Sequence, residues 1–104
     1  MSASPNRLSI TSQGPCSVAV SGEIDAHSVS ALADHLSDCT AIDGDIVIDM
    51  SAVTFMDSSG LRMLIELRQR TEAAPHDVVL RSPSTSVLRL LEVAGLDDHF
   101  TLDG

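Results

Sequence analysis

The spacing of apolar residues is the feature that most limits how this chain can fold. Leu8–Ser12 and Cys16–Ser21 alternate apolar and polar residues, as half-buried strands do, and together they predict a hairpin. Asp45–Met50 and Val78–Leu80 each contain a short, mostly β-branched apolar run, which favours strands covered on both faces in a parallel sheet. Phe100–Leu102 indicates a short last strand.

Helical spacing separates these strands at three places. From Ala26 onward apolar residues recur at i, i+3, i+4 and i+7, and Asp25 is placed to cap that helix. Two further helices are expected, over Ser58–Ala73 and from a Ser82-Pro83 cap to a stop at Gly95. The resulting order, ββαβαβαβ, predicts one α/β domain with a mixed β-sheet and helices packed on it.

Length and charge set further limits. A chain of 104 residues is one domain with one core, and we expect a flexible tail over residues 1–6 followed by a folded domain over residues 7–104. The chain has 15 acidic and 6 basic side chains, a net charge of −9, and neither Trp nor Tyr. Nucleic acids and anionic membranes bind basic surfaces, so neither is an expected partner.

The two cysteines, Cys16 and Cys39, lie far apart in the sequence. The first residues contain no apolar segment of the kind that a signal peptide requires. We therefore expect a cytoplasmic protein with free thiols. His27 and His35 are eight positions apart, which is not the spacing of a helical metal site, and neither a metal nor a cofactor is expected.

The segment Asp57-Ser58-Ser59-Gly60 is the best candidate for a functional site in the chain. We expect it to open a helix directly after residues 51–57, which the pattern predicts to be a connecting loop. Ser58 or Ser59 can cap that helix, where free N–H groups and the helix dipole favour an anion. The two serines are explained by a capping role alone. They are also compatible with a phosphorylation site, because a phosphate is tolerated at the N-terminus of a helix.

The residues around this segment resemble the signature of the anti-sigma factor antagonist family, whose fold is the STAS domain. Members of that family show a buried strand that ends in Asp, a linker similar to Val-Thr-Phe, and then Asp-Ser-Ser-Gly-Leu. This chain has Asp49, then Val53-Thr54-Phe55, then Asp57–Leu61. Residues 22–25 resemble the turn before the family's first helix, and residues 82–96 resemble its third helix. The resemblance covers nearly the whole chain and implies a single STAS-type domain.

The resemblance also implies a partner switch in which the protein is a substrate and not an enzyme. In that family the unmodified antagonist binds an anti-sigma factor that is also a serine kinase, and a sigma factor is released. The kinase phosphorylates one serine, and a serine phosphatase reverses the reaction. By position, Ser58 is the phosphoacceptor, and Asp57 orients its hydroxyl or the kinase's nucleotide. Ser59–Leu61 surround the phosphosite, Asp25 lies on the docking face, and the free protein is expected to be a monomer.

Three alternatives to this switch stay open. A STAS domain can also be a scaffold or adaptor in a transporter or stress-sensing complex without a phosphorylation cycle. An antagonist that has lost its kinase would act constitutively. A serine hydrolase is disfavoured because Met56 stands where the Gly-x-Ser-x-Gly elbow requires its first glycine.

Overall fold

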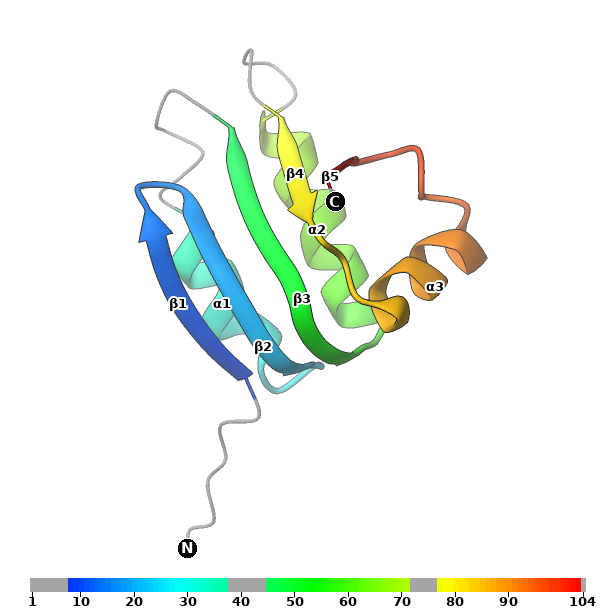
Figure 1. The fold of residues 1–104 in the computed structure, drawn as a ribbon, viewed down its shortest axis with the longest axis horizontal. Helices are drawn as coiled ribbons and strands as arrows, with labels where there is room; N and C mark the ends of the chain where they lie inside the picture. Colours follow the sequence, from blue (N-terminus) through cyan, green and yellow to red (C-terminus); the bar gives the residue numbers. More distant parts are fainter. Residues whose placement is uncertain (1–7, 38–44, 72–76, 104) are drawn as a thin grey trace, which may run out of the picture.

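The computed structural model describes residues 8–37, 45–71 and 77–103, which form one five-stranded sheet and three helices (Figure 1). The order of elements is ββαβαβαβ, as the apolar spacing predicts. The expected tail over residues 1–6 and the second cysteine, Cys39, lie outside the described residues. The strands are β1 (Leu8–Gly14), β2 (Ser17–Ile24), β3 (Ile46–Met56), β4 (Val78–Arg81) and β5 (Thr101–Asp103), and the helices are α1 (Val29–Ser37), α2 (Ser58–Thr71) and α3 (Thr85–Ala94).

The five strands pair in the order in which they occur in the chain. β1 and β2 form an antiparallel hairpin, and each later strand is parallel to the one before it. Right-handed crossovers between successive parallel neighbours place the connecting helices on one face of a sheet. α1 and α2 indeed lie side by side behind the sheet in Figure 1. The predicted mixed sheet is confirmed, and β2 and β3 end at the same end of the molecule.

Alternate residues of β2, β3 and β4 point into a core between the sheet and the helices. Burial of each large apolar side chain contributes about 1.5–3 kcal/mol to the free energy of folding. On the opposite face Ala19, Val47 and Val79 are only half-buried, so the strands are covered fully on one face and not on both as expected. The side chains with almost no exposure include Val18, Val20, Ile24, Ile46, Ile48, Met50, Val78 and Leu80 from the strands and Leu32, Leu36, Leu64, Val87 and Leu91 from the helices.

β2 and β3 run further than the alternation of apolar residues predicts. Residues 51–56, expected in a loop, are strand and pair with the end of β2. The register between the two strands shifts twice, and at each shift β3 has one residue more than β2. The buried residues Met50, Val53 and Met56 therefore recur at every third position, which hides the strand from an analysis of period two.

Two helices begin later than the sequence predicts. α1 starts at Val29 and not at Ala26, because residues 26–28 form a turn that precedes it. α3 is capped by Ser84 and not by Ser82: the Val87 N–H donates to the Ser84 hydroxyl at 3.4 Å. Ser82 has φ 48°, a left-handed conformation that differs from the extended backbone of a cap residue.

The end of the chain agrees with the sequence in part. Gly95 has φ 72° and ends α3, as predicted. The last strand, predicted over Phe100–Leu102, runs instead from Thr101 to Asp103; Phe100 before it is buried, and Leu102 within it is 38 % exposed. The predicted end of α2 near Ala73 lies outside the described residues.

Candidate functional site

The candidate site lies where β2 and β3 end side by side. Ile24 and Met56 are the last residues of β2 and β3 and are paired with each other. Each is followed directly by an aspartate, Asp25 after β2 and Asp57 after β3. The Asp57 N–H donates a hydrogen bond to the carbonyl oxygen of Ile24 at 3.1 Å. The two acids expected on one docking face are therefore held at adjacent strand ends.

Asp57, and not a serine, caps α2. Its Oδ1 accepts a hydrogen bond from the Ser59 N–H at 2.8 Å, and its backbone carbonyl accepts from the N–H groups of Gly60 and Leu61 at 3.1 and 3.2 Å. The expected cap, Ser58 or Ser59, is therefore wrong. Ser58 is the first helical residue; its side chain is exposed, and its hydroxyl forms no hydrogen bond within the part of the chain that the structure describes.

Gly60 allows the first turn of α2 to approach the strand ends closely. A Cβ atom on Gly60 would lie 2.6 Å from Met56 Cγ and 2.7 Å from Ile24 Cγ2, closer than side-chain carbon atoms can stand. Gly60 is itself buried, and Leu61 beside it is only 9 % exposed and belongs to the core. The residues after the phosphosite candidate therefore anchor the helix, and Ser58 faces solvent.

Asp25 shapes the turn on the other side of the site. Its carboxylate accepts hydrogen bonds from the N–H groups of His27 at 2.9 Å and Ser28 at 3.0 Å, and the Ser28 hydroxyl donates to the Glu23 carbonyl at 2.8 Å. These bonds, that from the Ser28 N–H above all, lower the pKa of Asp25 below its ordinary value. Asp25 therefore caps the turn over residues 26–28 and not α1 itself, which begins three residues later than the sequence predicts.

An open groove of about 350 Å³ runs between α1 and α2 beside Ser58. Its α1 side is apolar, and its α2 side carries the hydroxyls of Ser58 and Ser59 together with one cationic and one anionic side chain. This groove is not among the features predicted from the sequence, although the i, i+4 spacing of Ser58 and Arg62 places these two residues on one face of α2. The lining residues are Ala26, Val29 and Ala33 on one side and Ser58, Ser59, Arg62, Met63 and Glu66 on the other.

Phe55 adds an apolar side chain near the site. It is 47 % exposed, although the next residue, Met56, is buried, because successive residues of a strand point to opposite faces. Phenylalanine is among the residues enriched in protein interfaces, so Phe55 is a candidate docking contact.

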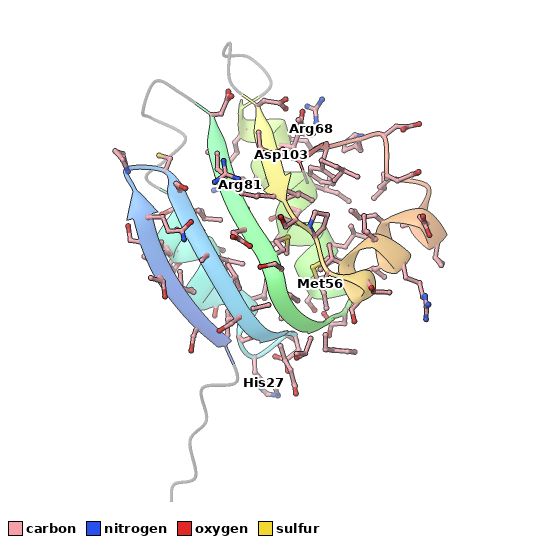
Figure 2. The ribbon with its side chains drawn as sticks, viewed as in Figure 1. His27, Met56, Arg68, Arg81 and Asp103 are labelled. Carbon is pink, nitrogen blue, oxygen red and sulfur yellow. The ribbon has the colours of Figure 1, made fainter. Side chains whose placement is uncertain are left out.

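The described residues give no support for other kinds of site. They contain no group of three or more His, Cys, Asp or Glu side chains that could hold a metal ion. None of the helices in the described ranges has the length and hydropathy needed to span a bilayer. Cys16 is a buried free thiol, and His27 is exposed and projects away from the sheet (Figure 2).

Comparison with known proteins places this fold and motif in one family. The STAS domain model matches residues 8–103, so the chain belongs to the STAS domain family. The anti-sigma-B factor antagonist of Listeria monocytogenes is 31 % identical over 80 residues, which are 76 % of this chain and 70 % of that protein. Within the STAS family, the chain therefore belongs with the anti-sigma factor antagonists.

Solved structures agree with this assignment. An anti-sigma factor antagonist from Mycobacterium paratuberculosis is 33 % identical, with a TM-score of 0.74 over 99 % of this chain and 90 % of that one. The anti-sigma factor antagonist SpoIIAA in its unphosphorylated form has a TM-score of 0.73 at 22 % identity, over 93 % of this chain and 88 % of that one. SpoIIAA of Bacillus in its phosphorylated form has a TM-score of 0.68 at 21 % identity, over 93 % of this chain and 91 % of that one. The predicted STAS-type fold is therefore confirmed.

Proposed function

We propose that this protein, in its unphosphorylated form, binds an anti-sigma factor that is also a serine kinase, and thereby releases a sigma factor for transcription. The kinase transfers the γ-phosphoryl group of ATP to the Ser58 hydroxyl oxygen, the hydroxyl proton leaves, and ADP is the other product. Phosphoserine 58 prevents binding, and a serine phosphatase restores the free hydroxyl by hydrolysis. The protein acts in the cytoplasm as a substrate of both enzymes.

One observation carries this proposal: the carboxylate of Asp57 caps α2, so the Ser58 hydroxyl is not needed for capping. A serine that caps a helix uses its oxygen to accept a backbone hydrogen bond. Ser58 is exposed at the first position of α2 and makes no such bond within the described residues. Its hydroxyl is accessible to a kinase without unfolding of the helix, which supports phosphorylation over a purely structural role.

Asp57 is suited to assist the transfer. Its Oδ1 is occupied by the Ser59 N–H, and its Oδ2 has no hydrogen bond within the described ranges. The second oxygen is therefore available to orient the Ser58 hydroxyl or to contact the Mg²⁺–ATP of the kinase. The fixed capping bond holds the carboxylate in one orientation while it does so.

The effect of the phosphate follows from charge. A phosphoserine carries about −1.5 to −2 charges at pH 7, next to Asp57 and on the same end of the sheet as Asp25. An interface that receives the neutral hydroxyl would have to desolvate this dianion beside two carboxylates. Loss of partner binding therefore needs no refolding of the STAS domain.

The test is phosphorylation by the serine kinases of the source organism, with ATP, followed by tandem mass spectrometry. We expect phosphate on Ser58 and none on the Ser58→Ala variant. Ser59→Ala is the matched control, since it removes the neighbouring hydroxyl and should keep the modification. Phosphate on another residue, with Ser58 bare, would overturn the assignment.

A pull-down separates the switch from the scaffold alternative. The unphosphorylated chain should capture an ATPase-like kinase, and the protein phosphorylated at Ser58 should not. Capture of a transporter subunit that is insensitive to phosphorylation would support a scaffold in its place.

A further inference from the structure

Arg62 is the charged residue best placed to meet a phosphate on Ser58. Residues four positions apart in a helix lie on the same face, with about 5–6 Å between their Cβ atoms. Long helical side chains also lean toward the helix N-terminus, which for Arg62 is the direction of Ser58. In agreement with this, Ser58, Ser59 and Arg62 line the same groove between α1 and α2.

The guanidinium of Arg62 is not used by the fold. It is exposed and takes part in no hydrogen bond or ion pair with the residues that the structure describes. By contrast, Arg81 pairs with Asp103 at 3.5 Å, and the Arg68 side chain donates to the His99 carbonyl. Figure 2 labels Arg68 on α2, and Arg81 on β4 with its partner Asp103 on β5.

The other charged or titratable groups at this end of the sheet include the carboxylates of Asp57 and Asp25 and the exposed imidazole of His27. Among the residues that line the groove, Arg62 is the cation for the phosphate. The α1 side is lined only by Ala26, Val29 and Ala33. Glu66 lies four residues beyond Arg62 and about 12 Å along the helix from Ser58. A helical ion pair in which the arginine precedes the glutamate is weaker than one in the reverse order. A phosphate dianion on Ser58 is therefore the stronger partner for Arg62.

We propose that Arg62 is the internal counter-ion of phosphoserine 58 and holds the phosphate in the groove between α1 and α2. The proposal rests on phosphorylation at Ser58. It deepens that function, because the phosphorylated state then has a contact of its own. The guanidinium binds two phosphate oxygens, as arginine does with phosphates generally, and the modification both adds charge and fills the groove with an ordered group.

The test uses full-length protein in which phosphoserine is installed at position 58 during translation, so that no kinase is needed. The phosphate is titrated by ³¹P NMR in the wild-type background and in Arg62→Gln. An unperturbed phosphoserine loses its second proton near pH 6, and a close guanidinium favours the dianion. We expect the midpoint in Arg62→Gln to lie higher by at least about 0.5 pH units.

Two further variants make the result specific. Arg89→Gln on α3 removes an exposed arginine from a different helix and should titrate like the wild type. Arg62→Lys should keep part of the lower midpoint, because a charge at that place still favours the dianion. Circular dichroism of each protein checks that the fold is kept.

Identical titration midpoints for the wild type and Arg62→Gln would overturn the proposal that Arg62 is the counter-ion. This holds even if the N–H groups at the start of the helix lower the midpoint in both proteins. That result would leave phosphorylation of Ser58 by a kinase untouched. If no kinase modifies Ser58, the proposed switch is wrong, whereas the NMR result on the installed phosphoserine remains valid.

Discussion

Gly60 stands against Met56, and a Cβ atom on the glycine would lie 2.6 Å from Met56 Cγ. This approach lets α2 begin directly above the ends of β2 and β3 and so sets the position of the preceding Ser58. The absence of a side chain at Gly60 is thus a condition for the geometry of the site.

Gly60→Ala should destabilise the fold by about 1–2 kcal/mol. Met56 and Ile24 are buried among other core side chains, so the shift that relieves the clash costs more than the gain of about 1 kcal/mol in helix propensity. Urea unfolding followed by circular dichroism measures the change. Gly14→Ala is the control, since the nearest atom there is Ser17 Cβ at 3.6 Å, an ordinary contact. Equal stability of the two variants would contradict the packing described for Gly60.

Removal of the α2 cap should cost more than removal of the exposed hydroxyl. Asp57→Ala is expected to lower the free energy of unfolding by about 1 kcal/mol, because the Ser59 N–H loses its acceptor. Ser58→Ala should change it by less than about 0.5 kcal/mol. Asp57→Asn keeps a good cap and should keep stability while it removes the charge. A larger loss in Ser58→Ala than in Asp57→Ala would show that the serine is the cap.

The stability contributed by Asp25 should disappear in acid. Hydrogen bonds from Ser28 and His27 lower the pKa of Asp25 below its ordinary value of 3.8, so near that pH the folded state binds fewer protons than the unfolded state. The contribution is therefore complete above pH 3.8 and is lost as the pH falls through the folded-state pKa. Wild type and Asp25→Ala should differ more in unfolding free energy at pH 7 than at pH 3.

Asp98→Ala provides the comparison for this pH effect. Asp98 is an exposed acid after α3 for which the described residues provide no hydrogen bond. Asp98→Ala therefore measures what the loss of one exposed acid alone does at the two pH values, and the change for Asp25→Ala between them should be larger. Equal changes for the two variants would rule out the hydrogen-bonded carboxylate of Asp25 as the source of the stabilisation.

Phe55→Ala should weaken binding to the anti-sigma factor without loss of stability. Its ring is 47 % exposed beside the site, and buried aromatic contacts at interfaces contribute about 1 kcal/mol or more, which is about fivefold in the dissociation constant. Isothermal titration calorimetry measures the affinity. Val93→Ala, at an 82 % exposed position on α3, should bind like the wild type. Equal weakening by both variants would place the docking surface elsewhere.

The apolar spacing was sufficient for the order of elements and the parallel core. Val78 and Leu80 are two positions apart in a strand, and Leu32 and Leu36 are four apart in a helix. All four are buried, as this spacing predicts. The spacing failed over residues 51–56, where extra residues in β3 break the alternation. Bulges arise from the pairing of two distant strands, and a local pattern does not report them.

The motif indicated the place of the site but not its internal bonds. Asp57 and the two following serines are all good capping residues, so composition could not decide which of them accepts the backbone hydrogen bond. The choice depends on where α2 starts, which the bond from Asp57 to Ile24 fixes across two strands. The groove with Arg62 depends in the same way on the packing of α1 against α2.

The agreement between strand order and chain order has a consequence for synthesis of the protein. A ribosome produces the chain from its N-terminus, so every strand after β1 emerges when its sheet neighbour has already been made. All residues of the site, from Asp25 to Glu66, precede β4. The first two thirds of the chain therefore contain every residue of the site, and the last third supplies only β4, α3 and β5.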